Sequence, residues 1–138
     1  MTINEAQDAV IEEFEDFTDW MDKYQMLIDL GNELEPLDEK YKNEQNLIDG
    51  CQSRVWIVCD QNPDGTLTFR GESDALIVKG LVCLLLRVVN GHTPEEIRDA
   101  DLYFIPQIGL AENLSPTRSN GLLAMIKRIK AYAVALSA

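Results

Sequence analysis

Several residue patterns that common enzyme classes need are missing from this chain of 138 residues. Its only histidine is His92, so a cysteine protease would lack an oriented base, and we expect His92 to lie on the surface at a helix end. A Cys-x5-Arg phosphatase loop would need arginine at position 57, which is Ile57. Walker and dinucleotide-binding glycine loops are absent. The sequence therefore argues against proteolytic, phosphatase and nucleotide-dependent chemistry.

Long hydrophobic runs are also missing. The longest, residues 75–89, is interrupted by Lys79 and Arg87 and is too short to cross a bilayer. The first 19 residues are rich in Glu and Asp, unlike a secretory or organelle-targeting peptide, which joins a basic segment to an apolar one. We therefore expect a cytoplasmic protein that does not insert into membranes.

Basic residues are scarce in the first third of the chain. Residues 1–49 hold 15 acids and 3 bases, whereas residues 50–138 hold 9 of each, so the whole net charge of −12 arises in the first third. Such a surface repels phosphate backbones, which argues against a nucleic-acid partner. It would guide a basic protein partner, or simply keep the protein soluble.

The three cysteines, Cys51, Cys59 and Cys83, are odd in number and unevenly spaced. They form neither the paired Cys-x-x-Cys arrangement of a zinc site nor an even disulfide framework. The spacing predicts free thiols in a reducing compartment.

The length and the hydrophobic fraction of 46% predict one domain spanning residues 1–138. Thr2 and Glu5 have capping-box spacing at the start of a helix over residues 3–15. A second helix begins near Thr18 and ends at Gly31. The following residues, 32–45, read as a loop with at most one helical turn.

A β-hairpin is predicted over residues 55–70, because two runs rich in β-branched and alternating apolar residues flank an Asn-Pro-Asp-Gly turn. A third strand is predicted near Leu47 and Ile48. A buried central helix, capped by Ser73 or Asp74, should follow, and two more helices should begin at Pro94 and near residues 115–116, respectively. This order predicts an α+β fold in which a small antiparallel sheet of about three strands packs against helices.

The most informative cysteine lies in the segment before the first predicted strand. Gly50 permits a sharp backbone turn and Cys51 follows it directly, so the thiol is expected at a loop tip that another protein can reach. Backbone N–H groups and the side chains of Gln52, Ser53 and Arg54 would each stabilise a thiolate, the reactive form of cysteine. The pattern alone also allows Cys51 to be an inert small residue.

The other two cysteines are expected to serve packing. Cys59 shares a strand face with Val55 and Ile57, which predicts a core thiol. Cys83 lies four residues from both Lys79 and Arg87 on the central helix, so two cations flank it. Core packing, with the cations directed outward, is the preferred interpretation.

Three ordered blocks of the sequence resemble one protein family and together extend over almost the whole chain. They are GCQS and VWI within residues 50–57, GESDA and IVKGL within residues 71–81, and LSPTRSNGL in residues 114–122. In these blocks the chain resembles the SufE family of sulfur acceptors, which includes the related CsdE proteins.

This resemblance implies a fold shared with IscU-type scaffold proteins and a role in iron–sulfur cluster assembly. Cys51 matches the family's acceptor cysteine, which would take persulfide sulfur from a SufS/CsdA-like cysteine desulfurase and thereby stimulate it. The sulfur would then pass to a SufBCD-like iron–sulfur scaffold complex. The exchange needs a thiolate and access, so we expect no metal and no cofactor in this chain, and pyridoxal phosphate belongs to the desulfurase.

Six further residues in these blocks are candidates for supporting the cysteine or contacting the partner. Asp74 has a second interpretation as a helix cap and Arg118 as half of an ion pair. The full set is Gly50, Gln52, Ser53, Asp74, Arg118 and Asn120.

Two other functions remain open from the sequence. The chain would act as an iron–sulfur scaffold if its three cysteines converged, which their places in a loop, a strand and a helix disfavour. It would act as a regulatory adaptor if it bound the desulfurase without carrying sulfur. A further hypothesis is that Cys51 stays tucked against Leu47, Ile48 and Trp56 until the partner arrives.

Overall fold

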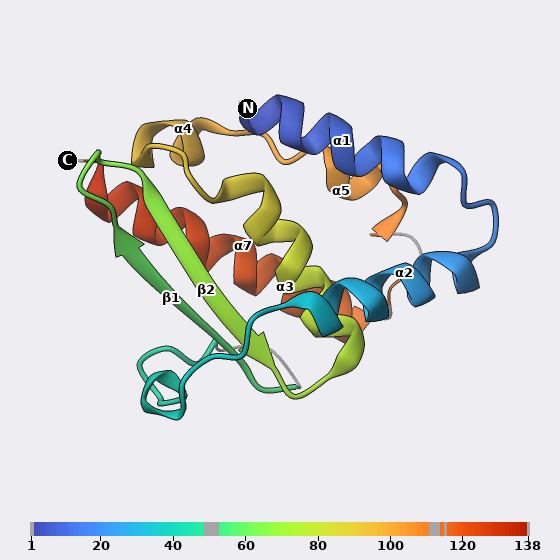
Figure 1. Cartoon of the computed structure of the whole chain (residues 1–138), viewed down its shortest axis with the longest axis horizontal. Helices are drawn as coiled ribbons and strands as arrows, with labels where there is room; N and C mark the ends of the chain where they lie inside the picture. The colour runs from blue at the N-terminus through green and yellow to red at the C-terminus, as the bar shows by residue number, and fades with distance from the viewer. Residues whose placement is uncertain (1, 49–52, 111–113, 115, 138) are drawn as a thin grey trace.

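The computed structural model describes residues 2–48, 53–110, 114 and 116–137 (Figure 1). A hairpin of two strands lies among helices, and the predicted α+β class is confirmed. The helices and strands, in chain order, are α1 (Ile3–Glu15), α2 (Trp20–Glu33), the 3-10 turn η1 (Glu39–Tyr41), β1 (Val55–Gln61), β2 (Leu67–Ser73), α3 (Leu76–Val89), α4 (Pro94–Asp99), α5 (Phe104–Gln107) and α7 (Pro116–Leu136).

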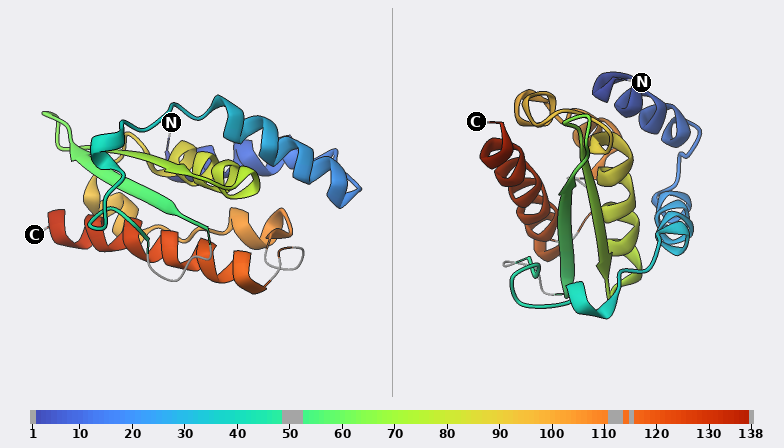
Figure 2. Two further views of the ribbon diagram at one scale, coloured as in Figure 1. Left: turned by 90° about the horizontal axis from the view of Figure 1, so that it is seen from below. Right: turned by 60° about the vertical axis from the view of Figure 1, so that its left-hand side comes forward.

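The elements form layers around α3. In both views of Figure 2, α7 lies on one side of the hairpin and α3, and α2 lies on the opposite side of α3. Ten of the 14 residues of α3 are buried, which confirms the predicted central helix. None of the helices in the described ranges combines the length and hydrophobicity of a bilayer span.

The first helix, α1, is held at its start by local capping bonds and along its length by contacts with a segment far away in the sequence. The Thr2 hydroxyl accepts a hydrogen bond from the Glu5 N–H, and the Glu5 carboxylate accepts one from the Thr2 N–H, each at 3.0 Å, so the predicted capping box is confirmed. Gln7, fully buried, donates to the Asp101 carbonyl at 3.0 Å and accepts from the Phe104 N–H at 3.1 Å. These two bonds fasten α1 to the chain around the start of α5.

The predicted hairpin is confirmed, with Val55 opposite Ser73 and Gln61 opposite Leu67. Gly65 in its turn has a φ of +89°, a conformation that favours glycine. The predicted third strand is reduced, among the described residues, to one isolated bridge between Leu47 and β1.

The second helix crosses α3 at a glycine contact rather than ending at a glycine. We predicted that Gly31 would terminate this helix, but α2 continues to Glu33 and Gly31 is buried inside it. A Cβ atom on Gly31 would lie 2.8 Å from Lys79 Cβ, and one on Gly80 of α3 would lie 2.1 Å from the Leu27 carbonyl oxygen. The two glycines therefore let the helix backbones approach, and Gly31 is needed for packing rather than for a helix end.

Two other local predictions are wrong. Neither Ser73 nor Asp74 caps α3, whose N-cap is Ala75 and has no side-chain cap bond. His92 is not on the surface, because its side chain is only 8% exposed and its carbonyl accepts a hydrogen bond from the Leu67 N–H at 2.9 Å. The chain after α3 thus pairs with the start of β2.

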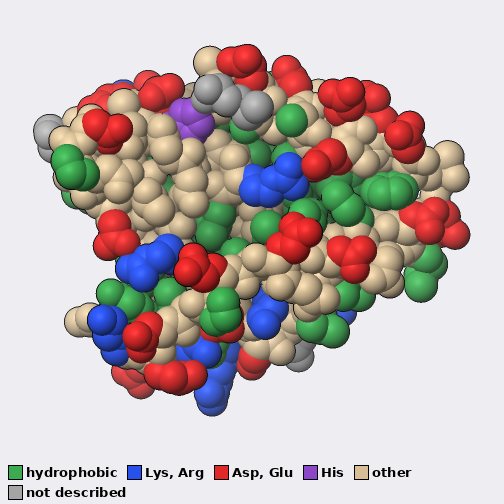
Figure 3. Space-filling view, in the orientation of Figure 1, with side chains coloured by type: hydrophobic (Ala, Val, Ile, Leu, Met, Phe, Trp, Pro, Cys, Tyr) green, Lys and Arg blue, Asp and Glu red, His purple; other side chains and the backbone are tan. Residues whose placement is uncertain are grey.

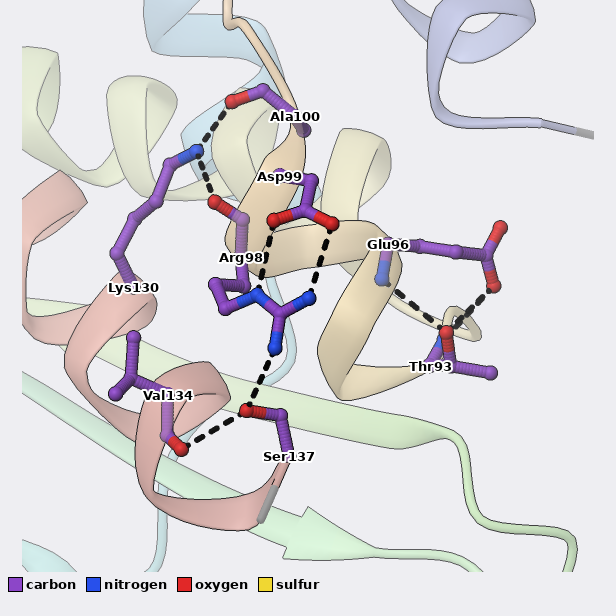
Figure 4. Close-up of polar contacts among 8 residues, drawn as sticks. All are labelled: Thr93, Glu96, Arg98, Asp99, Ala100, Lys130, Val134 and Ser137. Carbon is purple, nitrogen blue, oxygen red and sulfur yellow. Dashed lines mark hydrogen bonds and ion pairs between the residues drawn. The ribbon is translucent and has the colours of Figure 1, made fainter.

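Polar contacts fasten the carboxyl-terminal half of α7 to α4 (Figure 4). The Lys130 ammonium donates to the carbonyls of Arg98, at 3.3 Å, and Ala100. The Arg98 guanidinium donates to the Ser137 hydroxyl at 3.2 Å. Because cations complement the exposed carbonyls of a helix end, Lys130 stabilises the carboxyl end of α4 and fixes α7 beside it.

The glycine contact between α2 and α3 can be tested by Gly80→Ala. The added methyl group would overlap the Leu27 carbonyl and push the helices apart, so the free energy of unfolding should fall by about 2 kcal/mol. Urea titration followed by circular dichroism measures this. Gln25→Ala, at an exposed position of α2, is the control and should change stability by less than about 0.5 kcal/mol. Equal urea midpoints for Gly80→Ala and Gln25→Ala would contradict the close contact between α2 and α3 at Gly80.

Candidate functional site

Gly50, Cys51 and Gln52, three of the predicted site residues, lie outside the described residues, so the placement of Cys51 at a loop tip stays a prediction. The chain on either side of them is described, from Asn46 to Ile48 and from Ser53 onward. The site is therefore built from these flanking residues and from what they contact.

The two flanking segments are hydrogen-bonded to each other. The Ile48 N–H donates to the Val55 carbonyl at 2.8 Å, and the Ile57 N–H donates to the Asn46 carbonyl at 3.0 Å. The side chains of Ile48 and Val55 are both buried. Residues 46–48 and 55–57, which we call the stem, thus hold together the two ends of the segment that carries Cys51.

Asp74 lies against the residue that precedes β1. Its carboxylate accepts a hydrogen bond from the Arg54 N–H at 3.0 Å, and its own N–H donates to the Arg54 carbonyl at 3.2 Å. Ser53, which is half-buried, immediately precedes Arg54. The structure therefore places one predicted site residue, Asp74, against the residue that follows another, Ser53, and it uses Asp74 for this contact instead of a helix cap.

A second contact to the stem comes from α7 and was missed by sequence reasoning. The Arg128 guanidinium donates to the Gln45 carbonyl at 3.1 Å and to the Leu47 carbonyl at 3.0 Å. Both acceptors are backbone atoms, so no residue type at positions 45 and 47 indicates them. The sequence carries only a weak signal, a basic cluster at residues 127–130 in a predicted helix.

An open groove lies between the stem and α7. Its volume is about 640 Å³, and Ile48 forms one wall. Asn120, a predicted site residue, and Leu123, which is 56% exposed, line it from α7. Lys127 and Arg128 also line it, and no acidic residue is among its lining residues in the described part of the chain. The groove thus combines apolar and cationic side chains next to the stem.

Arg118 lies elsewhere. Its guanidinium carbon is 5.9 Å from the centroid of the Tyr24 ring on α2, and its Nη1 is 3.5 Å from the Tyr24 hydroxyl. Asn120 is two positions further along α7, about 200° around a helix, so the two side chains leave different faces. Of this predicted pair, the structure places Asn120 in the groove and Arg118 against α2.

Charge is distributed unevenly over the face shown in Figure 3. Acidic side chains line the side of the molecule that α1 and α2 form, whereas basic side chains lie mainly toward the centre and lower left, among acidic ones. The part of the acidic first third that forms α1 and α2 is therefore an outer face on the far side of α3 from α7.

The other two thiols are packed and protonated. Burial raises the pKa of Cys59, half-buried in β1, to about 11. Burial also raises the pKa of Cys83 in α3, against the opposing effect of the Arg87 charge. Both are free cysteines that contribute to or pack against the hydrophobic core, as predicted, although Cys59 is only partly buried. Since the thiolate is the nucleophile, neither thiol suits exchange chemistry at neutral pH.

The described part of the chain contains no group of three or more His, Cys, Asp or Glu side chains arranged to hold a metal ion.

Comparison with known proteins gives a family and a fold. The family model described as "SufE: Fe-S metabolism associated domain" matches residues 8–133. Among solved structures, the solution structure of a hypothetical protein from Thermus thermophilus superposes with a TM-score of 0.77 over 95% of each chain. The sequence identity of that pair is 22%, so the likeness shows a shared fold.

The protonated state of Cys59 can be tested by alkylation with iodoacetamide. A thiol with a pKa near 11 holds roughly a hundredfold less thiolate at pH 8 than one with a pKa of 9, so Cys59 should react about that much more slowly in the folded protein than in urea. Its rate should rise with pH until about pH 11. Peptide mass spectrometry measures the rate at each cysteine. Equal rates in the folded and unfolded protein at pH 8 would contradict the assignment.

Proposed function

Since this chain belongs to the SufE family, which is associated with iron–sulfur metabolism, we propose that it accepts persulfide sulfur from a cysteine desulfurase on Cys51. It then delivers that sulfur to an iron–sulfur scaffold complex of the SufBCD type. The observation that carries the proposal is the stem, which fixes both ends of the segment holding Cys51, while the two described thiols are packed and protonated.

The proposed step is a thiol–persulfide exchange. The Cys51 thiolate attacks the outer sulfur of the desulfurase persulfide, a new S–S bond forms to Cys51, and the S–S bond within the desulfurase persulfide breaks. The desulfurase cysteine leaves as a thiolate and takes up a proton, which balances the proton that Cys51 released. No external oxidant or reductant is needed. The exchange frees the desulfurase cysteine for another cycle, which is how the acceptor stimulates that enzyme.

The surroundings of the stem support a site that works inside a protein complex. The groove beside it presents Leu123, and Leu76 at the start of α3 is equally exposed at 56%. Large exposed apolar side chains near a functional segment are typical of a protein–protein contact. The pyridoxal phosphate that forms the persulfide belongs to the desulfurase.

The assignment of Cys51 is tested by transfer of labelled sulfur from cysteine through a cysteine desulfurase. Cys51→Ser should abolish label on this chain, because a hydroxyl does not form a persulfide, whereas Cys59→Ser and Cys83→Ser should accept normally. Mass spectrometry of the peptides locates the added 32 Da, about the mass of one sulfur atom.

Other outcomes would reject the proposal in distinct ways. Full acceptance by Cys51→Ser would place the sulfur on another residue. Unchanged stimulation of the desulfurase by Cys51→Ser, with no label on the wild-type chain, would indicate a regulatory adaptor. A stable, stoichiometric cluster chromophore after anaerobic reconstitution would indicate an iron–sulfur scaffold.

The groove is tested by Leu123→Glu. A carboxylate at this position would be desolvated by the docked desulfurase, so the dissociation constant should rise about tenfold or more. Val134→Glu is the matched control, because Val134 lies on the same helix and is 57% exposed, against 56% for Leu123, but does not line the groove. Calorimetric titration should show less than about a twofold change for the control. Equal effects of the two substitutions on the dissociation constant would show that the groove is not part of the interface with the desulfurase.

A further inference from the structure

We propose that Arg128 is a positioning residue for sulfur transfer: by holding the stem against α7, it sets how Cys51 is presented to the desulfurase. This inference rests on the proposed function. It concerns a side chain that lies outside the three blocks of family resemblance and makes its described contacts with backbone atoms.

The contact consists of two hydrogen bonds from one guanidinium to two backbone carbonyls, and we call this pair of bonds the clamp. The Arg128 guanidinium donates through Nη1 to the Gln45 carbonyl at 3.1 Å and through Nη2 to the Leu47 carbonyl at 3.0 Å. A guanidinium is planar and remains charged at every working pH, so it holds two acceptors at a fixed separation better than a single ammonium does. Charge-assisted hydrogen bonds of this kind are about twice as strong as those between neutral groups.

The two carbonyls that Arg128 binds lie a few residues before Cys51 in the chain. Leu47 forms the bridge to Trp56 of β1, and the next residue, Ile48, donates to the Val55 carbonyl. Position 51 is three residues after Ile48. A shift of the Leu47 peptide relative to α7 therefore moves the start of the Cys51 segment, while the other end stays attached to Asp74 through Arg54.

Removing the clamp should leave the stem folded. Asn46 is held independently, because its side chain donates to the Tyr41 carbonyl at 2.8 Å and its carbonyl accepts from the Ile57 N–H. Arg128 itself is only partly buried, so water can reach the carbonyls that it leaves. We therefore expect a change of position rather than an unfolded protein.

Lys130 provides a matched comparison on the same helix. It too is a cation that donates to two backbone carbonyls, those of Arg98 and Ala100, but these belong to the end of α4 (Figure 4). Two positions along a helix correspond to about 200° of rotation, so Arg128 and Lys130 brace α7 on different sides. Loss of Lys130 would weaken the packing of α7 without releasing the stem.

The test compares Arg128→Met, Arg128→Lys and Lys130→Met in single-turnover sulfur transfer from a persulfidated desulfurase in excess. Arg128→Met should slow transfer between about tenfold and a hundredfold at saturating desulfurase, because misplacement of a reacting atom by about 1 Å costs rates of that size. Arg128→Lys should recover part of the loss, since it restores one donor. Lys130→Met should transfer within about twofold of wild type even if its melting temperature falls as far as that of Arg128→Met.

A second measurement separates positioning from direct contact with the desulfurase. Without the partner, alkylation of Cys51 by iodoacetamide should become at least about threefold faster in Arg128→Met, because the folded stem is no longer held against α7. The rate should stay unchanged in Lys130→Met. Unchanged alkylation with slowed transfer would overturn the inference and make Arg128 a partner contact. Transfer and alkylation rates in Arg128→Met that match those in Lys130→Met would also overturn it.

Failure of the proposed function would give a different result from failure of the inference about Arg128. If wild-type protein carries no label on Cys51, sulfur acceptance itself is wrong, whereas normal labelling of wild type with normal rates in Arg128→Met rejects the clamp alone. Should Arg128→Met prove unfolded by circular dichroism, Arg128→Lys carries the comparison, and transfer at the wild-type rate by that variant would count against the two-point clamp.

Discussion

The close approach of α2, α3 and β2 through glycines is the constraint on which the rest of the structure depends. Gly80 lets α3 approach the Leu27 carbonyl of α2, and a Cβ on Gly71 of β2 would lie 3.0 Å from both the Trp56 carbonyl oxygen and Val82 Cγ1. Side chains at these positions would separate the layers. Because α3 is fixed on both sides, the short link from β2 to α3 is fixed too, and it places Asp74 where it holds Arg54.

Burial then decides which thiols are available for chemistry. Cys59 and Cys83 have the same functional group as Cys51, yet packing against the core raises their pKa values and keeps them protonated at neutral pH. A persulfide carrier benefits from this arrangement, because additional thiolates would compete for sulfur or form disulfides with the loaded cysteine. Under the proposed function, the packing that stabilises the fold would therefore also limit sulfur acceptance to Cys51.

Sequence reasoning succeeded where structure is decided locally. The capping box at Thr2, the helix start at Pro94, the hairpin turn and the buried central helix all follow from residues near one another in the chain, and the structure contains each of them. Sequence reasoning failed where a contact with a segment far away in the sequence determines the local structure. Gly31 has the sequence appearance of a helix end, and only the position of α3 shows why glycine is needed there.

The same limit applies to the site. The local pattern of His92 is typical of a surface helix end, but its backbone pairs with the start of β2 and its side chain is buried. Asp74 stays a predicted site residue, and its contact with Arg54, across 20 positions in the chain, could not be derived from helix-cap patterns. Arg128 was missed entirely because its acceptors are backbone carbonyls 81 and 83 positions away, which no side-chain pattern records.

The choice of carbonyl acceptors for Arg128 and Lys130 of α7 has an electrostatic consequence. This helix carries four basic residues and no acidic one, in a chain whose net charge is −12. If Arg128 were held by a carboxylate, that anion would lie beside the stem and would oppose formation of a nearby thiolate. Carbonyls fix the guanidinium without neutralising its positive charge. Anchoring the stem through backbone atoms therefore combines a fixed position with a positive charge beside it.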